Sequence, residues 1–231
     1  MHVHETSIVH PSLNLPRSTK IGAYTIIGEH VKLGENVTIG PFCSIGIEGI
    51  SSMDTVIQEN SIIRSHTIIY CGVRLGRHTT TGNHVTIREN TLISDNCSIG
   101  TLSDLQGDLE IGTFSRLHSN VHIAKGTIIG AYVWIFPYCI TTNDPHPPSS
   151  IRQSVIIEDY AVICVSSAIM PGIRVGSASL IGAHTKVTAD TEPGFLYVGN
   201  PSRKVMSTSR IRLQDSSRQS AYPWIKHYRY E

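Results

Sequence analysis

The sequence is poor in charge and in long apolar runs. Asp, Glu, Lys and Arg make up 16% of the 231 residues, and the formal net charge is +1. Because no basic block stands out, we expect no nucleic acid as a partner. No apolar run is long enough to cross a bilayer, and residues 1–12 lack the apolar core of a signal peptide. We therefore expect a cytoplasmic protein without a membrane partner.

Cysteine is scarce and follows neither ligand nor disulfide spacing. Of the five cysteines, Cys43, Cys97 and Cys139 each fall four places after an isoleucine, where other units carry threonine, serine or valine. Cys71 and Cys164 do not complete a ligand-spaced set. We predict that the first three cysteines pack as small core residues, and we expect neither a disulfide nor a metal.

A branched aliphatic residue at every sixth position is what the sequence has in abundance. One series runs from Val9 to Ile135 in a single register, with Thr81 in one position. A second series of the same period but another phase runs from Ile151 to Val187. The spacing is not that of a helix, whose apolar residues recur three and four apart. A short fixed period predicts stacked identical units that bury their aliphatic residues against one another.

Each six-residue unit predicts a short strand followed by a corner. The aliphatic residue and a small residue alternate with outward-facing positions, as in a strand. The third residue after the aliphatic is glycine, asparagine or histidine in many units, and these types tolerate positive φ. We assign this position to the corner, which accounts for five of the twelve histidines: His30, His66, His78, His84 and His184.

One insertion separates the two registers. Its sequence, TTNDPHPPSS at 141–150, holds three prolines and a serine pair and predicts a loop that leaves the stack. Residues 46–56 are irregular but keep the phase, so we expect less disturbance there. The repeats end after Val187, which divides the chain into a repeat domain, 1–192, and an exit segment with a tail, 193–231. The tail carries aromatic residues and is predicted to be partly helical: Tyr222, Trp224, Tyr228 and Tyr230.

Two histidines stand where the repeat does not call for one. His118 and His122 lie one and five places after Leu117, and both are predicted to point outward on either side of the corner residue Asn120. Histidine is the side chain most often used for proton transfer near neutral pH. His146 in the proline-rich loop is a further candidate base, because binding residues concentrate in such loops.

The units IGAYTI, IGEHVK, LGENVT and IGPFCS resemble the hexapeptide-repeat family, whose signature is [LIV]-G-x-x-[STAV]-x. The resemblance covers about Val9 to Glu192. It implies an all-β fold, a left-handed parallel β-helix of triangular cross-section with three units per turn. Known members are mostly homotrimeric acyltransferases with active sites between subunits, so the resemblance also implies a homotrimer.

Residues 111–144 are similar to a segment of the nucleotide-sugar N-acetyltransferases of this fold. The shared residues are Ser119-Asn120-Val121, Lys125-Gly126, Pro137 and Thr142-Asn143. The resemblance implies that Asn120 meets the thioester carbonyl, where an amide donor suits a developing oxyanion. His118 or His146 would then take the proton, and the acceptor sugar would contact His122, Asn143 and Asp144.

The sequence departs from that pattern at two positions. His118 stands where those enzymes carry an amide or another polar residue, and Ser119 replaces an asparagine. Lys125 stands where the lipid A acyltransferases of this fold carry their base histidine. Because a hydroxyl acceptor needs deprotonation more than an amine does, the loss of that histidine favours an amine acceptor.

The end of the repeats resembles that of acetyl-CoA enzymes, x-G-x-P-[AS]-[RK]-x-[IV]. Here it is Gly199-Asn200-Pro201-Ser202-Arg203-Lys204-Val205. The resemblance implies that the backbone at Gly199, Asn200 and Pro201 approaches the pantetheine. Cationic side chains would meet the phosphates of acetyl-CoA: Lys186, Arg203 and Lys204.

We therefore expect an acyltransferase that moves acetyl from acetyl-CoA to the amino group of a nucleotide-linked amino sugar in surface-polysaccharide biosynthesis. A sugar O-acetyltransferase is the near alternative. A γ-type carbonic anhydrase of this fold would need three converging histidines, and His84, His118 and His122 are not equivalent in the repeat. A non-catalytic scaffold is a third class, against which the 199–205 ending and the loop argue.

Overall fold

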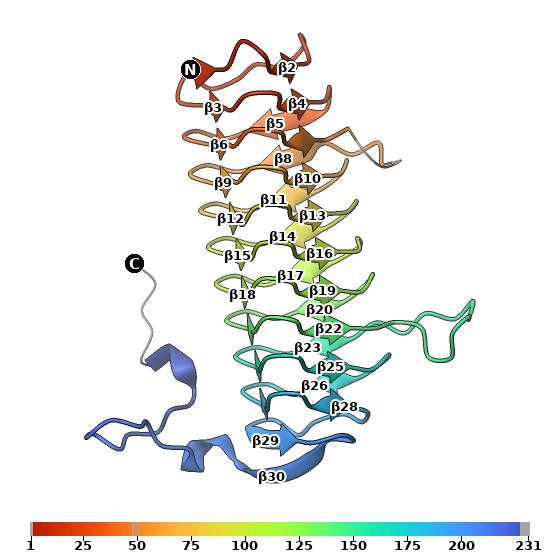
Figure 1. The fold of residues 1–231 in the computed structure, drawn as a ribbon, viewed down its shortest axis with the longest axis vertical. Coiled ribbons are helices and arrows are strands. Elements are labelled where there is room, and N and C mark those ends of the chain that lie inside the picture. The colour runs from red at the N-terminus through yellow and green to blue at the C-terminus, as the bar shows by residue number, and fades with distance from the viewer. Residues whose placement is uncertain (1, 48, 50, 227–231) are drawn as a thin grey trace.

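The computed structural model describes residues 2–47, 49 and 51–226, which form a parallel β-helix (Figure 1). Each turn of the chain contributes one strand to each of three sheets, which we call A, B and C. Figure 1 shows the turns stacked from the N-terminal end to the C-terminal end. The structure confirms the expected all-β, left-handed parallel β-helix of six-residue units.

Among the described residues, the strands of each sheet pair in parallel with one exception. Sheet A contains β1 (His2–Val3), β3 (Lys20–Ile21), β6 (Thr38–Ile39), β9 (Ile62–Ile63), β12 (Thr80–Thr81), β15 (Ser98–Ile99), β18 (Arg116–Leu117), β21 (Trp134–Ile135), β24 (Val162–Ile163), β27 (Leu180–Ile181), β29 (Phe195–Val198) and β30 (Arg203–Ser207). Sheet B contains β2 (Ile8–Val9), β4 (Ile26–Ile27), β7 (Ser44–Ile45), β10 (Ile68–Ile69), β13 (Thr86–Ile87), β16 (Asp104–Leu105), β19 (His122–Ile123), β22 (Ile140–Thr141), β25 (Ala168–Ile169) and β28 (Lys186–Val187). Sheet C contains β5 (Val31–Leu33), β8 (Thr55–Ile57), β11 (Arg74–Leu75), β14 (Leu92–Ile93), β17 (Glu110–Ile111), β20 (Ile128–Ile129), β23 (Ile156–Ile157) and β26 (Arg174–Val175). All pairs are parallel except β29 with β30.

Regular turns place a residue beside the one 18 positions later. In sheet A, Ile99 pairs with Leu117, and Leu117 pairs with Ile135. The aliphatic residue of each unit points inward, and the resulting columns form a continuous buried core. The residues on either side of it point outward, so every strand presents two outward rows along its sheet.

The corners carry the left-handed backbone that the sequence predicts. The third residue after the aliphatic has positive φ in nearly every predicted corner: Asn36, Asn60, His66, Gly72, His78, His84, Asn90, Asn96, Asn120, Gly126 and His184. His30 is the exception, because β5 begins immediately after it and no left-handed residue is needed. His30 therefore lies at a corner as predicted, but without the positive φ. Bulky residues also take this backbone, and their rings stack from turn to turn, as Phe114 does on Tyr132.

The cysteines behave as predicted. Cys43, Cys97 and Cys139 are buried, and none of the five cysteines is in a disulfide. Burial raises the pKa of the Cys97 thiol to about 12 and that of Cys139 to about 11. These thiols therefore stay protonated and unreactive near neutral pH.

The predicted loop is real, but its bounds differ. Thr141 fills the aliphatic position of β22 and is buried, and its hydroxyl accepts the backbone N–H of Ala124 at 2.8 Å. The next buried aliphatic residues are Val155, in the small-residue position, and Ile157, which lies ten residues later than one unit requires. Ile151 is 53% exposed, so the second series does not begin there. The loop therefore occupies residues 142–154 rather than 141–150.

The irregular residues 46–56 hold a second insertion, between β7 and β8, although less disturbance was expected there. Twelve residues separate Ile45 from Ile57, although the two lie on successive sheets. This insertion equals one repeat, so it leaves the six-residue register unchanged and cannot be seen by counting. Both loops leave the β-helix at the corner between sheets B and C, and Figure 1 shows them projecting on the same side.

The C-terminal tail folds back on sheet A of its own chain. It contains only two 3₁₀ turns in the described residues, η1 (Thr208–Arg210) and η2 (Trp224–Lys226). Trp224 is 3% exposed and packs with Val162 and Leu180. Two of the tail aromatics, Tyr228 and Tyr230, lie outside the described residues. None of the described helices is long and apolar enough to cross a membrane.

The two neighbouring residues of β14 test the inward and outward rows. Ile93 is fully buried and Leu92 is 45% exposed. We expect Ile93→Ala to lower the free energy of unfolding by about 2–5 kcal/mol, because it leaves a cavity in the core. Leu92→Ala, its matched control, should cost about 0.5 kcal/mol or less. Urea unfolding followed by circular dichroism measures both, and equal losses would contradict the assignment of the rows.

Candidate active site

The two outward histidines lie on different faces of the β-helix. His118 directly follows β18 of sheet A, whereas His122 begins β19 of sheet B. Asn120 forms the corner between them, with φ of 59°, and its backbone N–H donates to the Thr101 carbonyl at 2.9 Å. The structure thus places both histidines outward on either side of Asn120 but does not bring them together.

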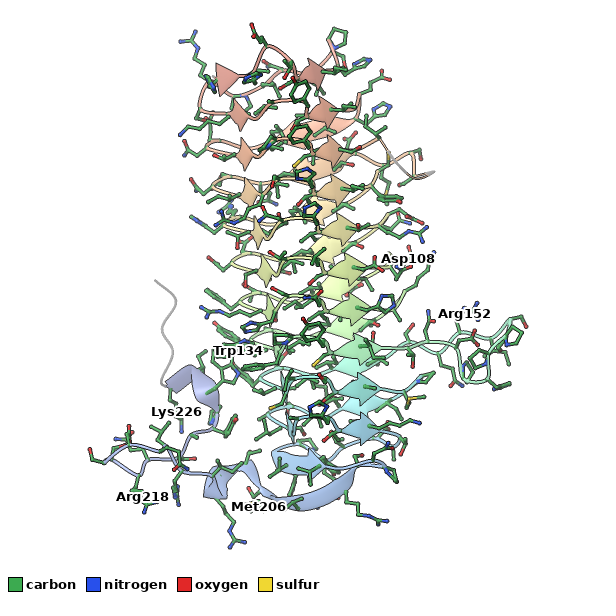
Figure 2. The ribbon with its side chains drawn as sticks, viewed as in Figure 1. Asp108, Trp134, Arg152, Met206, Arg218 and Lys226 are labelled. Carbon is green, nitrogen blue, oxygen red and sulfur yellow. The ribbon has the colours of Figure 1, made fainter. Side chains whose placement is uncertain are left out.

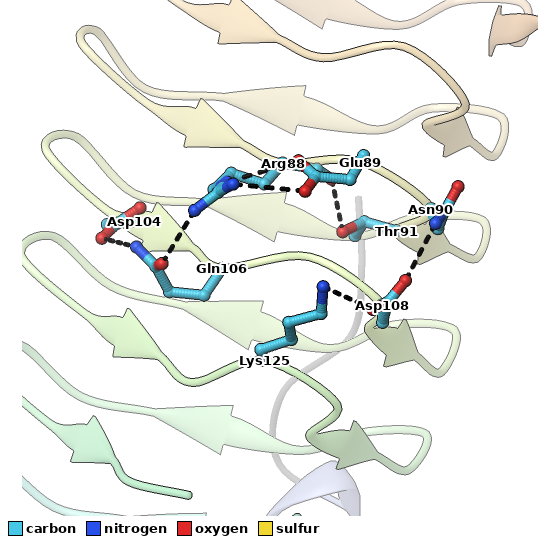
Figure 3. A network of polar contacts seen from close by, with 8 residues as sticks. All are labelled: Arg88, Glu89, Asn90, Thr91, Asp104, Gln106, Asp108 and Lys125. Atoms are coloured by element: carbon cyan, nitrogen blue, oxygen red, sulfur yellow. Dashed lines mark hydrogen bonds and ion pairs between the residues drawn. The ribbon is translucent and has the colours of Figure 1, made fainter. Parts of the chain in front are cut away.

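His122 is paired with a carboxylate on the preceding turn. Its Nδ1 lies 3.1 Å from Oδ2 of Asp104, which stands opposite it in the ladder. Gln106 donates to the same carboxylate, and Arg88 donates to Gln106 at 3.4 Å (Figure 3). These hydrogen bonds, His122 first, hold the pKa of Asp104 below its usual range.

The pair has the geometry of an oriented base. With Asp104 ionised, Nδ1 of His122 carries its proton toward the carboxylate, and Nε2 is left as the acceptor. This is the arrangement by which a carboxylate fixes the tautomer of a catalytic imidazole. Asp104 is not among the site residues predicted from the sequence. The signal was present, because Asp104 precedes His122 by 18 residues, which is one turn of the helix.

A groove of about 530 Å³ lies beside His122, at the corner between sheets B and C. We call it groove B, and its lining includes Gln106, Asp108, His122, Lys125, Asn143 and Arg152. Lys125 pairs with Asp108 at 2.9 Å, and Asn90 donates to the same carboxylate at 2.9 Å (Figure 3). The groove therefore combines a candidate base with hydrogen-bonding groups and paired charges.

The long loop supplies one wall of groove B. Asn143 donates through its amide to the Lys125 carbonyl at 3.1 Å, which ties the start of the loop to the corner. Asp144 pairs with Arg152 at 3.3 Å across the base of the loop. His146 is exposed and does not line the groove. Figure 2 shows Asp108 and Arg152 on the same side of the molecule, away from Trp134.

His118 belongs to an aromatic cluster on sheet A. Its ring stacks on Phe136 at 4.9 Å between centroids, and its Nε2 accepts the indole N–H of Trp134. Desolvation first, and the charge of Arg116 second, lower the pKa of His118. His118 is therefore neutral near pH 7, and the nitrogen that would act as a base is already engaged.

The predicted donor residues lie at the C-terminal end of the β-helix, with Lys186 in β28 of sheet B and Arg203 and Lys204 in β30 of sheet A. Lys186 is exposed and stands in the same outward row as His122, with Ile140 and Ala168 between them. Three strand spacings put these ends about 14 Å apart. The exit segment closes onto Lys186, whose backbone N–H donates to the Gly199 carbonyl at 3.0 Å.

The remaining donor candidates differ in how much they are engaged. Arg203 is exposed in β30, and Asn200 and Pro201 form the exposed turn before it. Lys204 pairs with Glu192 at 2.6 Å and lies 3.7 Å from the centre of the Phe195 ring. Lys204 thus already has two partners that hold it against the exit segment.

The three histidines of the carbonic anhydrase alternative are dispersed. His84 has positive φ at a corner, His118 lies on sheet A and His122 on sheet B. Over residues 2–47, 49 and 51–226, no three histidine, cysteine or acidic side chains are grouped so as to hold a metal ion. Within one chain, a three-histidine zinc site has no support from this geometry.

Comparison with known proteins agrees with the repeat. The bacterial transferase hexapeptide (six repeats) family matches residues 16–46, and the same unit continues through the β-helix described above. Over those residues the chain is similar to the hexapeptide-repeat proteins. A curated relative from Staphylococcus aureus (strain JH9), 2,3,4,5-tetrahydropyridine-2,6-dicarboxylate N-acetyltransferase, is 28% identical over 93 residues, which are 40% of this chain and 33% of the relative.

Solved structures show the same fold. The UDP-N-acetylglucosamine acyltransferase of Arabidopsis superposes with a TM-score of 0.60 at 17% identity, covering 89% of this chain and 74% of that one. The corresponding enzyme of Bacteroides fragilis 9343 has a TM-score of 0.60 at 21% identity, covering 84% and 74%. At these identities the likeness establishes the architecture. The chain spans about a third of the length of the curated relatives it matches.

The lowered pKa of His118 predicts an acid-sensitive contribution to stability. Its folded pKa lies below the ordinary value of 6.5, so the unfolded chain takes up this proton first as the pH falls. The contribution is present above about pH 6.5 and is lost on acidification below it. We expect the unfolding free energy of the wild type to fall more between pH 7.5 and 5.5 than that of His118→Asn. Urea unfolding at both pH values measures this, and equal losses would refute it.

Proposed function

We propose that this chain is an acyl-CoA-dependent acyltransferase that acts on the amino group of a nucleotide-linked amino sugar in the cytoplasm. The observation that carries the proposal is the hydrogen bond between His122 and Asp104 at the edge of groove B. It provides an oriented base in a groove that also holds Lys125, Asn143 and Arg152.

The outward row of sheet B supports a thioester donor. It begins at His122, continues through the apolar side chains of Ile140 and Ala168, and ends at the exposed cation Lys186. In that order, the thioester of acyl-CoA would lie at His122, its flexible arm along Ile140 and Ala168, and its phosphates at Lys186. We propose that the phosphates meet Lys186 and Arg203, because cationic side chains form strong charge-assisted hydrogen bonds with phosphate.

The proposed step transfers the acyl group in one displacement. The acceptor nitrogen attacks the thioester carbon, the new C–N bond forms, and Nε2 of His122 takes a proton from the nitrogen. The C–S bond then breaks, and the departing thiolate takes that proton from the imidazolium. Asp104 stays ionised and holds the ring. Asn120 does not line groove B, so its assignment to the oxyanion rests on the sequence resemblance.

The relatives support the class of donor and acceptor. The Staphylococcus aureus relative is named as an N-acetyltransferase. The Arabidopsis and Bacteroides fragilis structures that share the fold are UDP-N-acetylglucosamine acyltransferases. We further propose a homotrimer, in which a neighbouring chain would complete groove B.

An O-acyltransferase is the second candidate. A histidine oriented by a carboxylate is able to deprotonate a hydroxyl, and the His122–Asp104 pair is such a base. Pairs of substrates that differ only in an amino or hydroxyl group at the acceptor carbon would distinguish the two reactions.

Substitution of the base tests the reaction. We expect His122→Asn to lower kcat with acetyl-CoA and an amino-sugar nucleotide by about 10²–10⁴-fold, because general base catalysis is lost. Asp104→Asn should also lower kcat, because the carboxylate that orients the His122 ring is lost. His84→Asn is the matched control, since asparagine also tolerates the corner backbone. If His118→Asn abolishes turnover and His122→Asn does not, the base lies on sheet A and this assignment is wrong.

Removal of the charge at Lys186 tests whether the outward row of sheet B from His122 to Lys186 binds the acyl donor. We expect Lys186→Gln to raise the KM for acetyl-CoA about tenfold, the equivalent of one charge-assisted hydrogen bond, with kcat little changed. Lys204→Gln should have a smaller effect, because Lys204 is already paired with Glu192. Initial rates at varied acetyl-CoA concentration measure both KM values. A Lys186→Gln enzyme with the wild-type KM would show that this row of sheet B does not bind the donor.

A further inference from the structure

Sheet A carries a second groove that the proposed reaction does not use. Its volume is about 510 Å³, within the range of about 300–1,000 Å³ typical of small-molecule sites. We call it groove A. It lies across the Asn120 corner from His122, and its lining includes His78, Asn96, Ser98, Gly100, Arg116 and His118.

A stack of rings ends at this groove. The residues that directly follow the aliphatic residues of sheet A form one outward row, and in it His118 stacks on Phe136. The ring of Trp134, in β21, lies nearly parallel to both, with its centroid 5.8 Å from that of His118 and 5.2 Å from that of Phe136. One turn earlier the row reaches Gly100, which has no side chain to continue the stack. A Cβ on Gly100 would lie 2.4 Å from the backbone of His118, so the backbone itself requires glycine here.

The missing ring leaves a gap of defined size. Neighbouring turns are about 4.8 Å apart, and stacked rings elsewhere in this chain have centroids 4.4 to 5.2 Å apart. A planar ring above Gly100 would therefore stack on the face of His118. The next residue in the row is Gly82, which is also too close to the following turn for a side chain.

The polar groups around the gap favour an anionic ligand. The guanidinium of Arg116 lies 5.5 Å from the centre of the Trp134 ring, which places a cation at the edge of the groove. Asn96 and Ser98 offer donors and acceptors beside it. The residues that line groove A include Arg116 and two histidines but no carboxylate, in contrast to groove B with Asp108.

We propose that groove A binds a nucleotide, with the base stacked on His118 over Gly100 and the phosphate on Arg116. Asn96 and Ser98 would meet the polar edge of the base. Stacking of a base on a protein ring contributes about 1–3 kcal/mol, and a guanidinium suits phosphate through paired hydrogen bonds. Groove A lies on another face from the His122–Asp104 pair, so the proposal does not rest on the proposed reaction.

Calorimetric titration of the full chain with nucleoside 5′-monophosphates tests the site. Uridine and guanosine monophosphates represent a sugar nucleotide, and adenosine 3′,5′-bisphosphate represents the head group of the acyl donor. Ribose 5-phosphate lacks the base, and we expect it to bind at least about tenfold more weakly, by loss of stacking. Equal binding of ribose 5-phosphate would overturn the proposal in favour of a simple anion site.

Substitutions distinguish binding of the phosphate, at Arg116, from stacking of the base on His118. We expect Arg116→Gln to weaken monophosphates about tenfold or more while leaving the bare nucleosides unchanged. His118→Ser should weaken both, and His118→Phe should retain them because it keeps a stacking face. Arg64→Gln is the matched control: Arg64 is an exposed arginine on the same sheet, in the neighbouring outward row and outside groove A.

Two further outcomes decide against the site. No heat at nucleotide concentrations that would saturate a site with Kd of about 1 mM would overturn it, as would an Arg64→Gln effect equal to that of Arg116→Gln. Binding should be unchanged in His122→Asn, whatever that variant does to turnover. Failure of groove A and failure of the proposed reaction are thereby distinguishable.

Discussion

Backbone pairing between successive turns is the constraint on which the rest of this molecule depends. Strands of two residues bury too little surface to be stable alone, so each one exists because it pairs on both sides and because its aliphatic residue joins a continuous column. Pairing at a spacing of 18 residues fixes which side chains stand side by side, since only residues in the same position of the unit can be neighbours along a sheet.

The same constraint builds both grooves. Asp104 and His122 meet because they share one outward position on successive turns, and the ring stack of His118 and Phe136 follows the same rule. Insertions escape it only at corners, where extra chain does not break the ladder. The loop that begins with Asn143 therefore forms a wall of groove B without disturbing the strands on either side.

Periodicity predicted most of the fold but little of the side-chain chemistry. The buried cysteines, the corner backbone and the two faces of His118 and His122 all followed from position in the six-residue unit. Errors arose where the unit is not strictly kept. Thr141 took an aliphatic position through a hydrogen bond, Ile151 was assigned to the core but lies in the loop, and the insertion before Ile57 preserved the phase.

By itself the sequence determined a stack of short strands and corners, because units with a six-residue period bury their aliphatic residues only against neighbouring units. The resemblance to the hexapeptide-repeat family added the three-sided, left-handed form. The sequence also determined which histidines serve as corners and which point outward. Only the tertiary structure decided that Asp104 orients His122, that Trp134 engages His118, and that the tail covers its own sheet A. Such contacts join residues a whole turn or more apart, so they exist only after the turns have stacked.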